Sequence, residues 1–255
     1  MSSVSHHSRV ASQFGPRAAA YVASAVHAQG EDLQQLAELV RARPGARLLD
    51  LGSGGGHLSY AAAPHASEVV AYDLSAEMLG AVAATASERG IGNIATRQGP
   101  VETLPFEAAS FDIVATRMSA HHWLDFPAAL REARRVLKPD GVAFFIDIVS
   151  PGPGLLDTHF QAIELLRDPS HVRDYTMAEW LEAVTAAGFM PQRVTRRRLR
   201  IDYASWIERM GTAPEHAVAI RSLQSLASDE VRRHFEIEAD GSFTMDAMSL
   251  EATPR

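Results

Sequence analysis

The sequence predicts an α/β protein with a mostly parallel β-sheet that helices cover on both faces. Four short apolar runs, at 46–51, 68–73, 111–116 and 142–149, have the continuous hydrophobic character of strands that are buried on both sides. The segments between them repeat apolar residues at helical spacing. Because strands that alternate with helices at such intervals join into parallel β-α-β units, these two observations favour this fold class.

Two helices are expected before the first strand. The first is predicted over residues 16–28 and the second over 31–43. In the second, Leu33, Leu36 and Val40 recur at positions i, i+3 and i+7, so that they form one apolar face. An Arg-Pro-Gly sequence directly after this pattern ends the helix.

The following segments complete the predicted core. A helix is expected to begin near His57 and to end at Pro64, and Ser75 can cap the next helix with its hydroxyl group. A weaker strand is predicted at 93–99, between the second and third apolar runs. An amphipathic helix and a turn at 138–141 then lead into the last core strand.

Beyond residue 150 the pattern changes to helices mixed with β segments. The predicted elements are helices at 155–167, 177–187 and 214–227, a strand at 191–201 and a hairpin at 235–248. Thr176 and Glu179 form a capping box in front of the second of these helices. The hairpin is expected to turn at Asp240 and Gly241 and to supply one antiparallel strand to a seven-stranded sheet.

Composition limits the classes of protein to which the chain can belong. With 255 residues, 46% hydrophobic and 22% charged, it fits one globular domain: N-terminal lid helices at 1–45, a core at 46–150, and cap helices with the final strands at 151–255. The net charge of −7 argues against a nucleic-acid partner. The absence of cysteine excludes disulfides, and no apolar run is long enough for a membrane span, so we expect a cytoplasmic protein.

A glycine-rich loop follows the first predicted strand. After Asp50, the glycines Gly52, Gly54 and Gly56 form a G-x-G-x-G pattern. A ligand there would lie at the carboxyl ends of parallel strands, and glycine would let it approach the backbone closely. The dinucleotide pattern G-x-G-x-x-G requires a third glycine where this chain has His57, which argues against an NAD(P)-dependent oxidoreductase.

Asp73 ends the second predicted strand, 23 residues after Asp50. A carboxylate in this position can accept hydrogen bonds from both ribose hydroxyls of an adenosine. The alternative is that Asp73 only starts the next helix. Ser75 is the better-placed cap for that helix, which leaves Asp73 available for a ligand.

Several motifs together resemble class I S-adenosylmethionine-dependent methyltransferases. They are "LLDLGSGGG", "YD", "LPF", "FDIV" and "LREARRVLKPDGVAFFID", all within residues 46–149. The resemblance is greatest to the small-molecule branch of the methyltransferase domain 11 type, which includes the ubiquinone/menaquinone biosynthesis C-methyltransferases. It implies a Rossmann-like fold, S-adenosylmethionine as methyl donor, S-adenosylhomocysteine as product, and no metal.

The resemblance also implies which residues surround this cofactor. It places Asp50, Gly52, Ser53 and Gly54 at the methionine part, Asp73 at the ribose, Leu74 and Met78 on the adenine, Arg117 below the methyl group, and Tyr21, with Phe14, above the cofactor. The family usually has an acid that contacts the adenine amine where this chain has Pro100. Because proline can supply neither a side-chain acceptor nor an N–H, the Val101 amide or Glu102 must make that contact.

Two adjacent histidines are the candidate catalytic residues. His121 and His122 follow the fourth core strand, at the edge of the sheet where an acceptor would arrive. Adjacent residues rarely point in the same direction, so we expect at most one of them to face the pocket. The alternative is a helix start or a surface position.

Further candidates lie in the second half of the chain. His171, Arg173 and Tyr175 fall in "DPSHVRDY" and are either substrate contacts or part of a solvated loop. Asp147 near the end of the fifth strand is either a functional acid or a locally satisfied one. The basic run 196–200 is interpreted as a solvated strand face or a subunit contact, so a homodimer is among the expectations.

We therefore expect transfer of a methyl group from S-adenosylmethionine to a small, aromatic or apolar acceptor at carbon, oxygen or nitrogen. Reaction at an activated methyl group needs mainly alignment of the reactants and exclusion of water. The alternatives are a non-enzymatic S-adenosylmethionine-binding regulatory module and an NAD(P)-dependent oxidoreductase. A nucleic-acid methyltransferase is disfavoured because "TRMSAHH" stands where such enzymes carry an Asn/Asp-Pro-Pro-Tyr motif.

Overall fold

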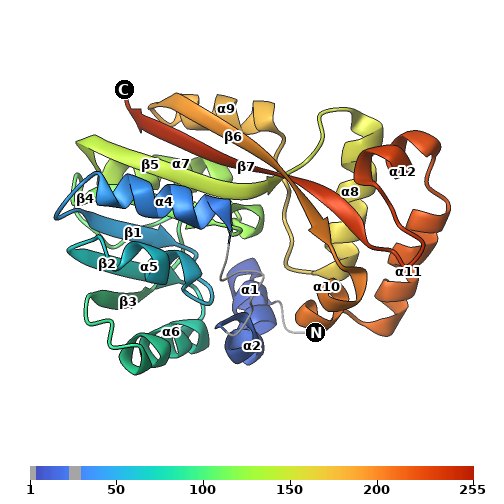
Figure 1. The fold of residues 1–255 in the computed structure, drawn as a ribbon, viewed down its shortest axis with the longest axis horizontal. Coiled ribbons are helices and arrows are strands. Elements are labelled where there is room, and N and C mark those ends of the chain that lie inside the picture. The colour runs from blue at the N-terminus through green and yellow to red at the C-terminus, as the bar shows by residue number, and fades with distance from the viewer. Residues whose placement is uncertain (1–3, 23–29) are drawn as a thin grey trace.

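The computed structural model describes residues 4–22 and 30–255. A seven-stranded sheet of order β3-β2-β1-β4-β5-β7-β6 forms its centre, and β7 is the strand that runs antiparallel to its neighbours (Figure 1). The strands are β1 (Arg47–Leu51), β2 (Glu68–Asp73), β3 (Ile94–Gln98), β4 (Phe111–Arg117), β5 (Leu137–Val149), β6 (Phe189–Ile201) and β7 (Phe243–Pro254). This order confirms the predicted mostly parallel sheet with one antiparallel strand.

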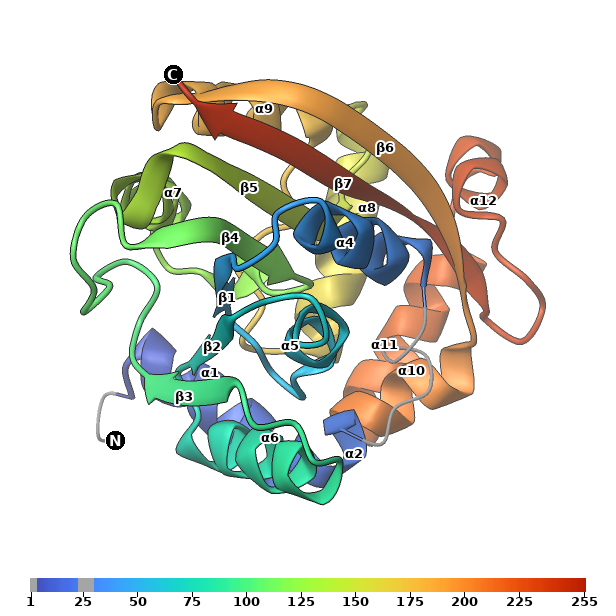
Figure 2. The same cartoon turned by 60° about the vertical axis from the view of Figure 1, so that its left-hand side comes forward.

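Helices cover both faces of the sheet (Figure 2). They are α1 (His6–Phe14), α2 (Ala18–Val22), α4 (Glu31–Arg41), α5 (His57–Ala62), α6 (Ala76–Glu88), α7 (Phe126–Val136), α8 (Gly154–Arg167), α9 (Met177–Ala186), α10 (Tyr203–Met210), α11 (Pro214–Ser225) and α12 (Asp229–Phe235). Successive side chains of β1 enter different cores: Leu48 packs with α4 and α5, and Leu49 packs with α7 and α9. No helix of the described residues is long and apolar enough to cross a membrane.

A helical lobe of α8, α10, α11 and α12 lies beside the sheet (Figure 1). The long strand β7 joins the two parts, because its first half enters the core of the lobe and its second half enters the core under the sheet. Phe243 and Met245 pack with Trp206 and Phe235 of the lobe, whereas Leu250 packs with the side chains of α7 and α9. The lobe and the sheet therefore share one continuous pair of strands.

The predicted hairpin at 235–248 is wrong. Residues 229–235 form α12, whose Val231 and Phe235 are buried one helical turn apart, and the chain then turns at Ala239 and Asp240. β7 pairs with β5 and β6 instead of with the segment that precedes it. The antiparallel strand is thus present, but its partners are distant in sequence.

The N-terminal segment differs from its prediction at both ends. A helix that was not predicted, α1, begins at the Ser5 cap, whose hydroxyl accepts a hydrogen bond from the Ser8 N–H. The predicted helix at 16–28 corresponds to a 3-10 turn, η1 (Gly15–Arg17), followed by α2, and residues 23–28 lie outside the described part of the chain.

The capping box at Thr176 and Glu179 is confirmed.

Candidate functional site

The glycine loop between β1 and α5 forms one wall of a cavity at the carboxyl edge of the sheet. Its backbone is left-handed at Gly52 (φ 67°) and Gly54 (φ 48°), a conformation that favours glycine. A Cβ on Gly52 would lie 1.8 Å from Ser119 Oγ, whereas a Cβ on Gly54 would meet no atom within 4 Å. The space beside Gly54 is therefore open to a ligand.

Asp73 at the end of β2 holds this loop in place. Its Oδ2 accepts a hydrogen bond from the Gly54 N–H (2.8 Å), and its Oδ1 accepts one from the Ser75 N–H (2.9 Å). Desolvation raises the pKa of the Asp73 carboxyl, although these N–H donors act in the opposite direction. Each carboxylate oxygen keeps further acceptor capacity toward the cavity.

Two polar atoms on the floor of the cavity have no hydrogen-bond partner among the described residues. They are Asp50 Oδ1 and Ser53 Oγ, both buried. The other oxygen of Asp50 accepts a hydrogen bond from the Ser59 hydroxyl (2.7 Å). Burial raises the pKa of Asp50 to about 7. Because buried polar atoms are normally paired, these two atoms indicate a polar ligand group at this end of the cavity.

The other predicted residues of this cavity also line it: Leu74, Met78, Val101, Glu102, Arg117 and Tyr21. The Glu102 carboxylate is partly occupied, since Oε1 accepts a hydrogen bond from the Leu124 N–H (2.9 Å) and Oε2 lies 3.3 Å from His7 Nε2. Arg117 forms a buried ion pair, with its Nε 2.5 Å from Asp32 Oδ2.

The N-terminal helices close the cavity from above. His57 Nε2 hydrogen-bonds to the Tyr21 carbonyl (2.8 Å), so the residue that replaces the third glycine ties the glycine loop to α2. The Phe14 ring packs edge-on against the rings of Tyr21 (centroids 5.5 Å apart) and His122 (5.0 Å). This wall is mainly aromatic.

A second, larger cavity of about 610 Å³ lies between the sheet and the helical lobe. It shares five wall residues with the first cavity: Phe14, Tyr21, Arg117, Met118 and His122. Apart from these, its walls come from Gly30 and the start of α4, from β5, α8, β6, α10 and β7, and from His121 and Asp174. The two cavities therefore meet at a common boundary.

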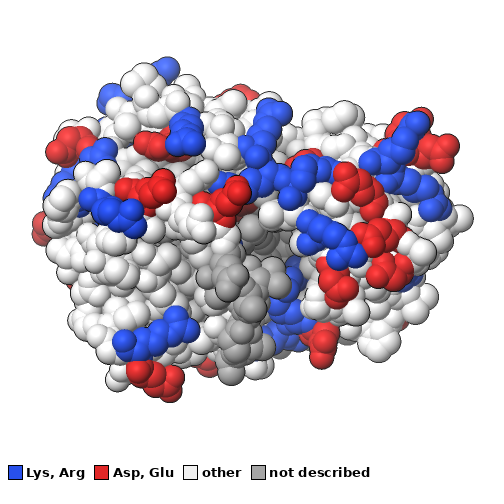
Figure 3. Space-filling view, in the orientation of Figure 1, with Lys and Arg blue, Asp and Glu red and all other residues white. Residues whose placement is uncertain are grey.

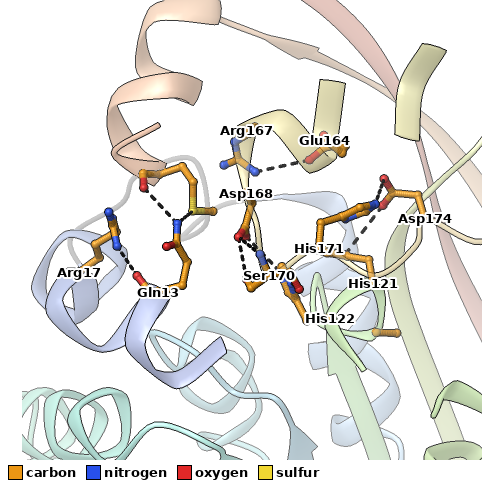
Figure 4. A network of polar contacts seen from close by, with 12 residues as sticks. Gln13, Arg17, His121, His122, Glu164, Arg167, Asp168, Ser170, His171 and Asp174 are labelled. Carbon is orange, nitrogen blue, oxygen red and sulfur yellow. Dashed lines mark hydrogen bonds and ion pairs between the residues drawn. The ribbon is translucent and has the colours of Figure 1, made fainter. Parts of the chain in front are cut away.

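Both histidines of the 3-10 turn η2 (Ala120–His122) line the second cavity, so the expectation that at most one faces a pocket is wrong. The tight turn brings their rings to a centroid distance of 4.2 Å. His121 Nδ1 lies 2.7 Å from Asp147 Oδ1, and His122 Nδ1 lies 3.1 Å from the Ser170 carbonyl. Figure 4 shows the two rings facing the segment that follows α8.

The two histidines differ in charge at neutral pH. Burial disfavours the charged form of His121, but the Asp147 carboxylate outweighs burial and raises the pKa of His121 to about 9. Burial and the neighbouring charge of His121 lower the pKa of His122 to about 4. His121 is therefore an imidazolium that donates hydrogen bonds, and His122 is a neutral ring.

The pair His121–Asp147 predicts a stability that falls as the pH rises. Because the folded-state pKa of His121 is above its unfolded value of about 6.5, the stabilisation is complete below pH 6.5 and is lost as the pH rises through about 9. We expect the free energy of unfolding to fall by at most about 1.4 kcal/mol per pH unit from this group. The free energy of unfolding, measured by urea denaturation between pH 6.5 and 9, should change less with pH in Asp147→Asn than in the wild type.

The exposed Asp140 provides the control for this measurement. Asp140→Asn removes a carboxylate at the surface and should leave the pH slope as in the wild type. An equal slope in Asp147→Asn and the wild type would contradict the assignment of charge to His121.

The comparisons with known proteins support the resemblance. Residues 49–145 match the model of a family described as "Methyltransferase domain". The chain is 36% identical to the uncharacterized methyltransferase YcgJ of Bacillus subtilis, over 95% of this chain and 98% of that protein. The chain belongs to this methyltransferase family. It is also 46% identical to the uncharacterized protein YafE of Escherichia coli, over 77% of this chain and 95% of that protein.

Two further comparisons concern the structure and the branch of the methyltransferase. The crystal structure of YcgJ from Bacillus subtilis superposes with a TM-score of 0.85 at 35% identity, over 88% of this chain and 98% of that one. The methyltransferase is 29% identical to the nocamycin O-methyltransferase of Saccharothrix syringae, over 81% of this chain and 68% of that protein. It is 37% identical to the ubiquinone/menaquinone biosynthesis C-methyltransferase UbiE of Shewanella sp. (strain ANA-3), over 45% of this chain and 47% of that protein.

Three predicted substrate residues of the methyltransferase line neither cavity: His171, Arg173 and Tyr175. His171 Nε2 lies 3.0 Å from Gln161 Oε1, and burial lowers the pKa of His171 to about 2. Arg173 pairs with Asp157 and Glu179 at the surface of the lobe. The Tyr175 ring stacks on a core phenylalanine at a centroid distance of 4.0 Å.

Sequence reasoning missed the charged wall of the second cavity in the methyltransferase. Glu164 and Arg167 on α8, Asp174 after it and Arg209 on α10 all line this cavity. "DPSHVRDY" indicated a polar loop, but nothing in the pattern indicated that α10, about 40 residues later, would face the same cavity.

The basic run 196–200 lies on the edge strand β6. Arg198 pairs with Asp246 (3.0 Å), and Arg200 pairs with Glu238 (2.6 Å). Figure 3 shows blue and red residues side by side on this face. The run is therefore both a wall of the second cavity and a charged strand edge, and such charges protect an edge strand from pairing with another chain.

Proposed function

We propose that the protein transfers a methyl group from S-adenosylmethionine to a small acceptor that is apolar or aromatic in its main part. The observation that supports this proposal is the common boundary of the two cavities at Phe14, Tyr21, Arg117, Met118 and His122. A donor in the first cavity and an acceptor in the second would meet there. Two relatives are named as a nocamycin O-methyltransferase and a ubiquinone/menaquinone biosynthesis C-methyltransferase, and these names support a small-molecule acceptor.

The first cavity fits the charge and shape of S-adenosylmethionine. The methionine end of S-adenosylmethionine carries an ammonium group, and the unpartnered Asp50 Oδ1 and Ser53 Oγ can accept hydrogen bonds from it. The open space beside Gly54 allows close approach, and Asp73 at the next strand can accept the ribose hydroxyls. When bound, S-adenosylmethionine would supply an electrophilic methyl group on its sulfonium.

The remaining lining residues complete this proposed site. Leu74 and Met78 would pack on the adenine, and the Val101 amide would contact its edge, because the Glu102 carboxylate already accepts a hydrogen bond from the Leu124 N–H. Gly52 would place its backbone against the methionine part. Arg117 below and Tyr21 above would enclose the reacting end and exclude water.

The two histidines would act on the acceptor. His121 would donate a hydrogen bond to the acceptor, because it is charged at neutral pH. His122 would accept the proton of an acceptor that must lose one, since its Nδ1 is engaged with the Ser170 carbonyl and its Nε2 can take the proton. Asp168 Oδ2, which has no hydrogen-bond partner among the described residues, lies 3.8 Å from that nitrogen and would stabilise the resulting charge.

The first test is binding of S-adenosylhomocysteine. At 100 times its dissociation constant we expect a stabilisation of about 2.7 kcal/mol, measured as a shift of the thermal transition. NADH at the same concentration is the control and should produce no shift. Absence of a shift with S-adenosylhomocysteine would contradict the proposed cofactor.

The second test is transfer itself. The protein is incubated with S-adenosylmethionine that carries an isotopic methyl group and with a cell metabolite extract, and labelled products are found by mass spectrometry. We expect a labelled small molecule that is absent without protein. Binding of S-adenosylhomocysteine without any labelled product would favour a non-enzymatic binding module.

A further inference from the structure

We infer that the methyl acceptor carries an oxyanion group, a carboxylate or a phosphate, which binds between Arg167 and Arg209 in the second cavity. This inference rests on the proposed function, because it names the chemical class of the acceptor. It adds a binding residue on each of two helices of the lobe, α8 and α10. Neither residue is in the cavity assigned to the cofactor.

Arg209 is a half-buried cation without an acidic partner. Its Nε is buried and has no hydrogen-bond partner, and no carboxylate of the described residues forms an ion pair with its guanidinium. Burial and the charge of Arg167 lower the pKa of Arg209. A side-chain hydrogen bond with Tyr21 acts in the opposite direction. Because a half-buried charge without a carboxylate partner is costly, a bound anion would stabilise this arrangement.

Arg167 is held in place beside the cavity. Its Nε donates a hydrogen bond to the Trp206 carbonyl (3.2 Å), and its guanidinium lies over the Trp206 ring at 4.8 Å. The distance from its Nη1 to Glu164 Oε2 is 3.6 Å, which is longer than a hydrogen bond (Figure 4). A fixed guanidinium of this kind is suited to planar oxyanions.

Glu164, the acid next to Arg167, pairs with it only at 3.6 Å. Burial raises the pKa of Glu164, which favours its uncharged form. The Tyr21 hydroxyl lies near both arginines, and burial raises its pKa, so it stays a neutral hydrogen-bond donor. Two guanidinium groups and one phenol thus face the same part of the cavity.

The rest of the second cavity is suited to an apolar body. Ile146, Ile148, Met210, Met245 and Trp206 contribute to its walls, and its volume of about 610 Å³ is typical of a small-molecule site. An acceptor that matches both parts of the cavity has an apolar or aromatic body and one anionic group. The arginines would fix the anionic end, so that the body points toward the boundary with the first cavity.

The test compares probes that differ only in charge. Binding of 1-naphthoate, 1-naphthyl phosphate and the neutral 1-naphthamide is measured by calorimetry on protein saturated with S-adenosylhomocysteine. We expect at least one acid to bind about tenfold or more tightly than the amide. The tighter of the two acids identifies the oxyanion as carboxylate or phosphate. Arg209→Met should reduce acid binding to the level of the amide and leave amide binding unchanged.

Control variants make the result specific. Arg131→Met removes the same charge from an exposed position on α7 and should leave all three affinities unchanged. Arg209→Lys should keep part of the preference for the acid. The inference is overturned if acids and amide bind equally, if neither acid binds, or if Arg209→Met keeps the preference. Failure to bind S-adenosylhomocysteine in the wild type would instead overturn the proposed function.

Discussion

Replacing Asp73 by alanine is expected to weaken binding of S-adenosylhomocysteine by about 10³-fold. In the proposed complex this carboxylate accepts two hydrogen bonds from the ribose, and each bond to a charged group contributes about 1.5–3 kcal/mol. The substitution also removes the acceptor of the Gly54 and Ser75 N–H groups, so the glycine loop loses its anchor. Calorimetric titration of the purified variant measures the effect.

Asp140→Ala is the matched control for this prediction. Asp140 is an exposed aspartate on β5, so the same chemical change there should leave the affinity within about twofold of the wild type. Circular dichroism confirms that both variants are folded at the temperature of titration. Wild-type affinity in a folded Asp73→Ala would show that the ribose is held elsewhere.

Replacing His122 by asparagine is expected to lower the turnover number for labelled product by about 10²-fold, if the acceptor must lose a proton. The asparagine amide can still donate to the Ser170 carbonyl, as His122 Nδ1 does, but it cannot accept a proton in place of Nε2. Affinity for S-adenosylhomocysteine should stay within about twofold of the wild type. The rate of labelled-product formation at saturating donor is the measurement.

The pH profile distinguishes a base from a structural residue. Because the pKa of His122 is lowered to about 4, the wild-type rate should show no loss from protonation of this ring between pH 8 and 6. His65→Asn alters a half-buried histidine in the turn after α5, outside both cavities, and serves as the control. An unchanged rate in His122→Asn would exclude this residue as the base.

The core of the fold and the first cavity were predictable because their signals are local. The apolar runs that became β1, β2, β4 and β5 are each continuous in sequence, and parallel pairing then places Asp50 and Asp73 at one edge. The glycine loop stands out because left-handed residues favour glycine. The structure brings both acids and this loop into one cavity.

The second cavity was not predictable in the same way because its residues come from distant segments. Arg167 and Arg209 lie on separate helices, and the pairing of β6 with β7 brings these helices together. The segment before β7 was predicted as a strand, because "FEIEADGSFTM" places a turn between apolar residues. Burial of Phe235 against the ring of Phe160 (5.5 Å) in the lobe makes it the last residue of α12 instead, and residues 236–242 form turns and irregular chain.

The shared strands β6 and β7 determine which parts of the molecule can separate. A hinge between the sheet and the lobe would have to interrupt a ladder that pairs without a break from Arg193 with Glu251 to Ile201 with Phe243. Arg209 and the cofactor cavity should therefore move together as one body. We expect movement that admits ligands to involve α1 and α2, which contact the rest of the protein through hydrogen bonds such as His57 with the Tyr21 carbonyl and Gln13 with the Met210 carbonyl. Loading of the donor and loading of the acceptor would thus be controlled by the same N-terminal gate.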